Sequence, residues 1–441
     1  MVVSCSIKAA EVLERLSKHI LVDGFPIVVD LKGSEGVWLK DAATGKLFLD
    51  CYSYFASLPL GHNHPAVLEE GFKERLLEAA LANPANSDVY TTLLAESVDV
   101  FARIASPRGF KHLFFVAGGA VAVENALKCA FDWKSKKNAT LGKPPADKVV
   151  YFDEAFHGRT GYALSCTHIS GAKIDLFPRL QWLMLPNPKL TFPVTEEVEA
   201  DVAAKEAEVL ATLENALKEE GWRYAAIIIE PIQGEGGDNH FRGEFLAGLR
   251  SLADRYDVML VFDEVQTGCG TTGKFWCWQH FGVAPDIIVF GKKSQVCGII
   301  ATERVDEVEE NVFTVSGRIN STWGGNLVDF VRGARYLEVI SEEGLVANAS
   351  DVGIYFLASL QDWAEKQNGL ITNVRGRGLM LAFDTPSADF RAKLWKAAFD
   401  AGLLCLPLRD KSIRFRPPLI FSNDNVDTVI ETLDEAIKKV K

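Results

Sequence analysis

The sequence predicts an α/β protein with a mostly parallel central sheet, helices on both faces of that sheet, and a smaller α+β domain. Short apolar segments alternate with segments of helical periodicity through the middle of the chain, which is typical of βαβ units. These apolar segments are continuous rather than alternating with polar residues, which favours a sheet covered on both faces. After about residue 327 the order changes to two helices followed by short strands, which indicates the second, smaller domain.

Length and charge exclude several classes of protein. The chain has 441 residues, of which 48% are apolar and 24% charged, as in ordinary globular proteins. The net charge of −12 disfavours nucleic acid or an anionic membrane as the main partner. No apolar run approaches the roughly 18 residues of a membrane span, and charged residues interrupt the first thirty positions. We therefore expect a cytoplasmic protein.

The N-terminal part predicts a helix and a hairpin. Residues 8–21 carry apolar side chains at helical spacing, and residues 36–51 form two apolar runs around a turn at Thr44-Gly45. We expect three divisions of the chain: residues 1–60 joining the small domain, residues 61–326 forming the large domain, and residues 327–441 forming the small domain.

The large domain is expected to contain five strands, each followed by a helix or a loop. The predicted strands are His112–Val116, Val149–Phe152, Ala225–Glu230, Val258–Asp263 and Asp286–Phe290, and the helices are Val121–Lys134, about Thr195–Glu220 and Glu244–Tyr256. The small domain is expected to contain helices near 327–341, 345–366 and 425–440, and strands near 370–374, 378–383, 403–406 and 412–415. In open α/β sheets, ligands bind at the carboxyl ends of the strands, so the residues after each strand are the candidate site.

Small and aromatic residues follow the first two strands. Ala117-Gly118-Gly119-Ala120 precedes a helix, whose free N–H groups and positive dipole end can hold a phosphate, although a Gly-Gly turn is more often only a turn. After the next strand, Phe156 can stack on a planar ligand and Arg159 can bind a carboxylate through two hydrogen bonds. The alternative for this segment is a surface loop with one packed phenylalanine.

Charged residues follow the other three strands. Glu230 opens a loop of acids and glycines, for which a tight loop with solvated carboxylates is the alternative. Asp263 continues an apolar strand, where a carboxylate is costly unless a protonated ring nitrogen or the N–H groups of the next turn meet it. Lys292 and Lys293 follow another apolar strand, where a desolvated lysine can lose its proton and become a nucleophile, whereas a lysine at an arbitrary position would be a solvated surface group. Together with the phosphate seat and the aromatic residue, these groups predict pyridoxal 5'-phosphate as the cofactor.

The eight cysteines and eight histidines form no metal-binding pattern. The sequence contains neither Cys-X-X-Cys nor HExxH, so we expect no metal site. Most cysteines stand in apolar contexts, which favours small core residues over disulfides. We expect loop structure at His62 and His64.

Longer strings resemble the class III (omega) aminotransferases, which are fold-type-I enzymes that use pyridoxal phosphate. The matching stretches span most of the chain: Phe115–Lys128, Phe156–Arg159, Glu230–Gly237, Phe262–Gly268, Asp286–Lys292 and Thr322–Asn326. The strings GGAVAVENALK, EPIQGEGGDNHFRGEF, GKKSQVCGI, NSTWGGN and IRFRPPL are similar in particular to L-lysine 6-aminotransferases.

The resemblance implies roles around the cofactor ring. Lys292 would bind the cofactor covalently and later move the proton, and it is preferred over Lys293 because the reactive lysine of the family follows a small residue. Asp263 would pair with the ring nitrogen. Phe156 and Val265 would enclose the ring from its two faces.

The resemblance also implies the residues around the ring hydroxyl and the phosphate. Gln266 would reach the hydroxyl, and Glu230 would stand behind it, holding Gln266 or the hydroxyl network. Gly119 and Ala120 would hold the phosphate through backbone N–H groups, since this loop offers no hydroxyl. Thr322 of the partner subunit would complete the phosphate site in a homodimer.

The reaction that the resemblance implies is transfer of the ε-amino group of L-lysine to 2-oxoglutarate. The products are 2-aminoadipate 6-semialdehyde, which cyclises to piperideine-6-carboxylate, and L-glutamate. Glutamate places a carboxylate beside the reacting carbon, whereas lysine places methylenes there, and an unpaired buried arginine would be costly. Glu235 would be a movable partner for Arg414, which the family position favours over Arg416. Arg159 would hold the distal carboxylate of either substrate, with help from Asn320.

Three alternatives stay open at this point. The chain can be an aminotransferase for ornithine, 4-aminobutyrate or another terminal amine. It can also be a racemase or mutase, because such enzymes share Lys292 and Asp263, although an alternating Glu–Arg pair favours transamination. The third alternative is a regulator that binds the cofactor without catalysis, which an intact Lys292 and Asp263 disfavour.

Overall fold

The large domain is built on a central sheet of seven strands. The computed structural model describes residues 7–169 and 171–441. The strand order is β3-β11-β10-β9-β6-β4-β5. The strands are β3 Phe110–Val116, β4 Lys148–Phe152, β5 Leu183–Leu185, β6 Tyr224–Ile229, β9 Met259–Asp263, β10 Ile287–Phe290 and β11 Cys297–Thr302. Five of them are parallel neighbours and β11 is antiparallel to both β10 and β3, which confirms the mostly parallel sheet.

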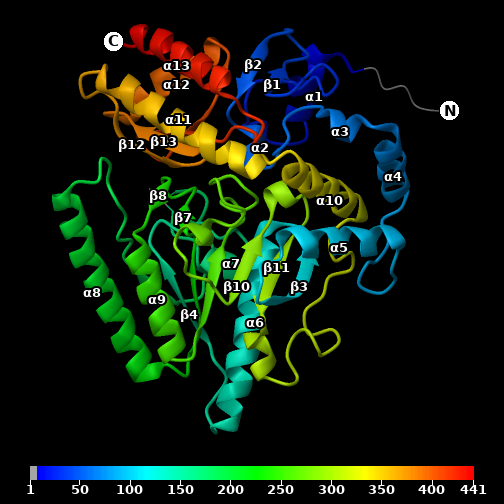
Figure 1. Cartoon of the computed structure of the whole chain (residues 1–441), viewed down its shortest axis with the longest axis vertical. Helices are drawn as coiled ribbons and strands as arrows, with labels where there is room; N and C mark the ends of the chain where they lie inside the picture. Colours follow the sequence, from blue (N-terminus) through cyan, green and yellow to red (C-terminus); the bar gives the residue numbers. More distant parts are fainter. Residues whose placement is uncertain (1–6, 170) are drawn as a thin grey trace.

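Helices cover both faces of this sheet (Figure 1). Val149 and Tyr151 of β4 pack with α6 (Gly119–Thr140), whereas Val150 and Phe152 pack with α8 (Glu196–Glu220) and α9 (Gly243–Arg255). Successive side chains of a strand point to opposite faces of the sheet. A sheet with helices on both faces therefore needs strands that are apolar at every position. The predicted two-sided cover is therefore confirmed.

Three further helices pack beside β3, β10 and β11 at one edge of the large domain. They are α4 Glu70–Leu81, α5 Thr92–Ala105 and α10 Leu327–Glu342, and their apolar residues form one cluster with Ile288, Phe290 and Ile300. The sequence prediction did not include α4 and α5. Thr91 accepts a hydrogen bond from the N–H of Leu94 at 3.1 Å, which is a helix-start signal that could have located α5.

The small domain contains an antiparallel sheet of order β12-β13-β16-β15 beside three helices. Its elements are α11 Leu345–Glu365, β12 Thr372–Arg377, β13 Met380–Asp384, α12 Ala388–Asp400, β14 Leu403–Leu404, β15 Leu406–Leu408, β16 Ser412–Phe415 and α13 Asn423–Lys438. The predicted strand 403–406 is divided between two sheets, because β14 leaves this sheet to pair elsewhere. The prediction also omitted α12.

The N-terminal segment lies beside the small domain (Figure 1). The hairpin of β1 (Trp38–Lys40) and β2 (Leu47–Asp50) is as predicted, and β14 pairs in parallel with β2, with Leu403 opposite Leu49. This pairing joins the N-terminal hairpin to a strand of the small domain in one three-stranded sheet. The division of the chain at residues 60 and 326 stays a prediction.

The N-terminal helix is shorter than predicted. A 3-10 turn at Ala9–Glu11 and α1 (Val12–Ser17) replace the expected helix over residues 8–21. None of their residues is buried, and Leu16 and Ile20 are exposed. Since helical stability in proteins comes mostly from packing an apolar face, a face without a neighbour does not sustain the longer helix.

Short elements complete the description of the fold. They are α2 Ser53–Ala56, α3 Pro65–Leu68, α7 Gly161–Ser165, β7 Ile232–Gln233 and β8 Asn239–His240. Among the helices of residues 7–169 and 171–441, none is long and apolar enough to cross a membrane. Every cysteine in these ranges is free, and all but Cys297 are buried, while Cys5 lies outside the described residues.

Candidate active site

The carboxyl ends of five strands of the large sheet meet at one cavity of about 660 Å³. It brings together residues predicted from segments that are far apart in the sequence. The predicted site residues that line it are Gly119, Ala120, Phe156, Arg159, Glu230, Glu235, Asp263, Val265, Gln266 and Lys292. Ser57, His157, Gln295 and Cys297 also line it, and the sequence analysis assigned no role to any of these four.

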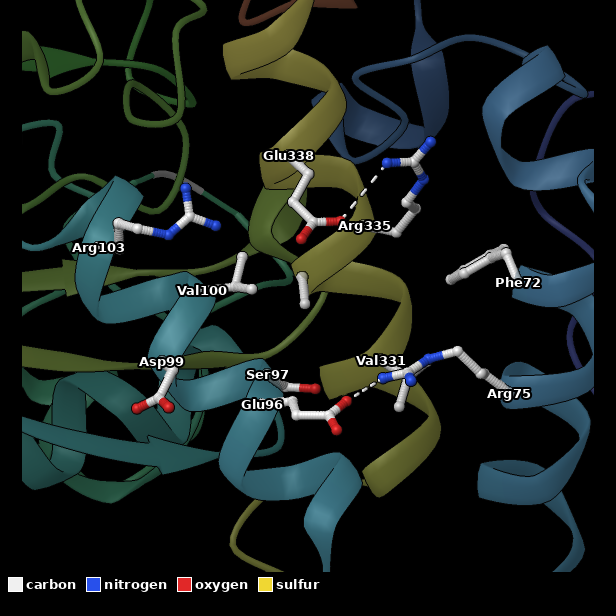
Figure 2. Close-up of a pocket in the computed structure, with 11 residues that line it drawn as sticks. Phe72, Arg75, Glu96, Ser97, Asp99, Val100, Arg103, Val331, Arg335 and Glu338 are labelled. Carbon is white, nitrogen blue, oxygen red and sulfur yellow. Dashed lines mark hydrogen bonds and ion pairs between the residues drawn. The ribbon is translucent and has the colours of Figure 1, made fainter.

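A second hollow, of about 540 Å³, lies between α4, α5 and α10 (Figure 2). Two pairs of its charged side chains face one another: Arg75 pairs with Glu96, and Arg335 lies 3.5 Å from Glu338. Phe72 and Val331 supply its apolar wall. The lining residues of this hollow include no lysine or cysteine, whereas the first cavity contains Lys292, so the first cavity is the candidate active site.

One wall of the first cavity is the start of α6. Gly118 precedes the helix without a side-chain cap, so the first backbone N–H groups of a 22-residue helix are free for a ligand. Gly158 lies against this turn with φ of 131°, and a Cβ atom there would come within 2.5 Å of the Cβ of Ala120. Only glycine allows both this conformation and this close approach.

Asp263 is buried at the end of β9 and uses both carboxylate oxygens. Oδ1 accepts the backbone N–H of Val265 at 3.1 Å, which is the turn cap that the sequence left open as an alternative. Oδ2 lies 2.8 Å from Nδ1 of His157. The His157 ring is buried and its Nε2 has no partner among the described residues. The sequence analysis missed His157, because nothing local indicates that its ring reaches a residue 106 positions away.

Glu230 does not hold Gln266, and this part of the expectation is wrong. Its carboxylate instead accepts the backbone N–H groups of Phe156 at 2.9 Å and Gly234 at 3.0 Å. It therefore connects the loops after β4 and β6. Burial raises the pKa of Glu230 to about 7, and the nearby Asp263 charge acts in the same direction.

Gln266 is held by Arg416. The Nε and Nη2 atoms of Arg416 donate to Oε1 of Gln266 at 3.1 and 3.0 Å, and its Nη1 donates to Asp238 at 2.8 Å. The backbone carbonyl of Gln266 accepts from Nζ of Lys293 at 2.7 Å. Arg416 and Lys293 are thus engaged with the protein, which leaves Lys292 as the lysine that faces the cavity.

Lys292 has the features of a reactive lysine. Its φ of 56° is in the left-handed region, a conformation that costs free energy for a residue with a side chain and that recurs at functional sites. Burial, together with the charges of Arg414 and Arg416, lowers the pKa of Lys292 to about 8. A lysine with this pKa is neutral far more often at physiological pH than an exposed lysine is.

Glu235 lies between two cations. Its Oε2 accepts from Nη2 of Arg414 at 2.9 Å, as the expected Glu–Arg pair requires, and its Oε1 pairs with Nζ of Lys173. Burial alone would raise the pKa of Glu235, but the charge of Arg414 and the contacts of Lys173 lower it below its ordinary value. Lys173 was not identified from the sequence.

Three of the predicted residues are exposed. Arg159 lies at the cavity without a hydrogen-bond partner among the described residues, which leaves its guanidinium available to a ligand. Asn320 and Thr322 do not line the cavity of their own chain as far as it is described. The carbonyl oxygen of Thr322 accepts from Ser87 at 3.1 Å. Their contribution to a site stays a prediction.

Comparison with known proteins places the chain in a family. A family model described as aminotransferase class-III matches residues 22–437. The chain belongs to the class-III aminotransferases. Among relatives of this aminotransferase, the L-lysine-epsilon aminotransferase of Mycobacterium bovis is 46% identical over 430 residues, which are 97% of this chain and 95% of that protein. The L-lysine-epsilon aminotransferase of Streptomyces clavuligerus is 42% identical over 439 residues, covering 99% of this chain and 96% of that protein.

A solved structure agrees with this assignment. The lysine aminotransferase from M. tuberculosis in the internal aldimine form has a TM-score of 0.96 at 45% identity, and the match covers 99% of this chain and 100% of that chain. The fold-type-I architecture expected from the sequence is therefore confirmed, and pyridoxal phosphate is the cofactor of this aminotransferase.

The residues of the cavity fit this cofactor. The free N–H groups at the uncapped start of α6 can bind a phosphate, and the buried carboxylate of Asp263 can pair with a protonated ring nitrogen. The amine of Lys292, whose pKa is lowered, can react with the carbonyl carbon of the cofactor. Phe156 and Val265 supply apolar walls for a planar ring. Each chemical part of pyridoxal phosphate thus has a matching group in the cavity.

The lowered pKa of Lys292 predicts how cofactor uptake depends on pH. Only the neutral amine can react with an aldehyde, so the rate at which apoprotein binds pyridoxal phosphate covalently should rise with pH around a midpoint near 8. An ordinary lysine would give a midpoint near its usual value of about 10.4. Stopped-flow absorbance across pH 6 to 10 measures the midpoint, with free pyridoxal phosphate and an exposed-lysine peptide as the reference reaction. A midpoint above about 10 would contradict the buried position of Lys292.

Proposed function

We propose that this aminotransferase transfers the ε-amino group of L-lysine to 2-oxoglutarate. The products are 2-aminoadipate 6-semialdehyde, which cyclises to piperideine-6-carboxylate, and L-glutamate. The observation that carries the proposal is the ion pair between Arg414 and Glu235, of which Glu235 lines the cavity together with Lys292. Two relatives named as L-lysine-epsilon aminotransferases at 42–46% identity support the choice of lysine.

The proposed chemistry divides the work between the cofactor and the chain. When bound, pyridoxal phosphate supplies an electron sink that weakens the C–H bond of the carbon bearing the transferred nitrogen. Nζ of Lys292 would take the proton from that carbon and deliver it to the cofactor carbon that keeps the nitrogen; in the second half of the cycle it would move a proton in the opposite direction, to the carbon of the acceptor that receives the nitrogen. Asp263, oriented by His157, holds the proton of the ring nitrogen. The N–H groups at the start of α6 hold the phosphate.

Alternating substrates require the Glu235–Arg414 pair to open and close. Lysine brings methylenes to the reacting carbon, so Arg414 keeps Glu235 as its partner. Glutamate and 2-oxoglutarate bring a carboxylate to the same place, which takes over Arg414 while Glu235 moves aside. Because neither state leaves the buried arginine unpaired, one pocket can accept both shapes. Arg159 holds the distal carboxylate in both cases. Asn320 does not line the cavity of its own chain as far as that cavity is described, so its help would come from the partner subunit.

The proposal includes an assembly and a location. A homodimer would bring Thr322 of the partner subunit to the phosphate, which is consistent with its exposure in its own chain. A cytoplasmic location, expected from the composition, belongs to the same proposal.

Titration of the purified holoenzyme tests the substrate. We expect L-lysine to convert the visible absorbance of the pyridoxal form efficiently, and 2-oxoglutarate to restore it. L-Ornithine and 4-aminobutyrate, run in parallel, should react at least about tenfold less efficiently, since a change in length displaces either the amine or the distal carboxylate. A clear preference for L-ornithine or 4-aminobutyrate would mean that this amine, and not L-lysine, is the amino donor. Conversion of the amine without transfer of its amino group to 2-oxoglutarate would favour a racemase or mutase.

A further inference from the structure

Lys173 lies on the segment that connects α7 to β5 and contacts Glu235, which lines the cavity. Its Nζ pairs with Oε1 of Glu235 and lies 5.8 Å from the centre of the Phe156 ring. The neighbouring Ile169 and Ile174 pack with Phe156 in one apolar cluster. This packing anchors the segment beside the cavity, so the contact of Lys173 with Glu235 is part of the site.

We propose that Lys173 is the charge partner that keeps Glu235 compensated while Arg414 binds the carboxylate of a substrate. This inference rests on the proposed alternation of the Glu235–Arg414 pair. Lys173 acts through Glu235, so it is a positioning residue that determines how well the enzyme accepts substrates with a carboxylate at the reacting carbon.

The geometry separates the two contacts of Glu235. Arg414 holds Oε2 at 2.9 Å, and Lys173 holds Oε1. Breaking the arginine contact therefore leaves the lysine contact in place. Side-chain exposure is 22% for Glu235 and 37% for Lys173, so the displaced carboxylate can turn towards the more open side of the site.

The energetic role of Lys173 differs between the two substrates. When glutamate occupies Arg414, Glu235 without Lys173 would be a partly buried carboxylate without a cation, which is costly. When lysine is bound, Arg414 still pairs with Glu235, and the loss of Lys173 removes only one of two partners. A substitution that removes the charge of Lys173 should therefore weaken the binding of L-glutamate much more than the binding of L-lysine.

Lys173→Met tests this difference, because methionine keeps much of the length without the charge. Both L-glutamate and L-lysine convert the pyridoxal form of the holoenzyme, so their half-reactions can be compared on the same protein by stopped-flow absorbance. We expect the apparent Kd of L-glutamate to rise about tenfold and that of L-lysine less than about twofold, with similar rates at saturation. Lys173→Arg should restore the wild-type ratio. Lys205→Met, which removes an exposed lysine paired with Asp201 on α8, is the matched control.

Two results would overturn the inference. An equal rise in the apparent Kd of both substrates would mean that Lys173, together with Arg159, binds the distal carboxylate that both substrates carry. Unchanged Kd values for both would mean that Glu235 needs no second cation. If the wild-type protein accepts another terminal amine instead of L-lysine, the proposed substrate is wrong, and the same ratio is measured between L-glutamate and that amine.

Discussion

Replacing Lys292 by alanine should lower aminotransferase activity by about 10⁴-fold or more, because it removes both the covalent attachment of the cofactor and the group that moves the proton. The reason for this expectation is that Lys292 faces the cavity, since burial lowers the pKa of both adjacent lysines, to about 8 for Lys292 and about 7 for Lys293. Borohydride reduction of the wild-type holoenzyme should attach the pyridoxyl group to the peptide that contains Lys292. Steady-state turnover with L-lysine and 2-oxoglutarate measures the loss in Lys292→Ala.

Lys293→Met is the matched control, because the two lysines are adjacent and differ in direction. Nζ of Lys293 donates to the carbonyl oxygen of Gln266, so this variant loses a structural contact and keeps the reactive amine. We expect it to bind the cofactor covalently and to retain most of its activity. Covalent labelling of Lys293 in the wild-type protein would show that the reactive lysine is wrongly assigned.

Asp263→Asn should lower kcat by about 10³-fold while the fold is retained. An amide has nearly the same shape as the carboxylate but no charge, so it cannot stabilise a proton on the ring nitrogen, and the cofactor would be a weaker electron sink. The amide can also disturb the contact with His157 at 2.8 Å. Single-turnover rates with L-lysine, together with thermal unfolding, separate the chemical loss from any loss of stability.

Asp286→Asn is the corresponding control, because Asp286 stands at the amino end of a strand of the same sheet, away from the cavity. Asp286 is also buried, but it precedes β10 and pairs with Arg250 at 2.9 Å and Arg304 at 3.0 Å. We expect this variant to be less stable and to turn over at close to the wild-type rate. If both asparagine variants lost activity in proportion to their stability, the special role of Asp263 would be excluded.

Local sequence patterns were sufficient to predict the central part of the fold. The continuous apolar segments before Phe156, Glu230, Asp263 and Lys292 became parallel strands, because a segment apolar at every position is stable only where both faces are covered. The prediction omitted β11, whose antiparallel pairing with β3 and β10 depends on how the chain returns across the sheet edge. The N-terminal helix was predicted too long, since its apolar face lacks a neighbour.

The sequence by itself determined which residues stand at the ends of the strands, and hence most of the cavity. Strand ends follow from short-range periodicity, and the carboxyl ends of parallel strands meet at one edge. Only the tertiary structure decided which side chains pair there. His157 meets Asp263, Arg416 rather than Glu230 holds Gln266, and Lys173 shares Glu235 with Arg414. These partners are distant in the sequence, and each pairing depends on strand order and loop path together, which no local pattern encodes.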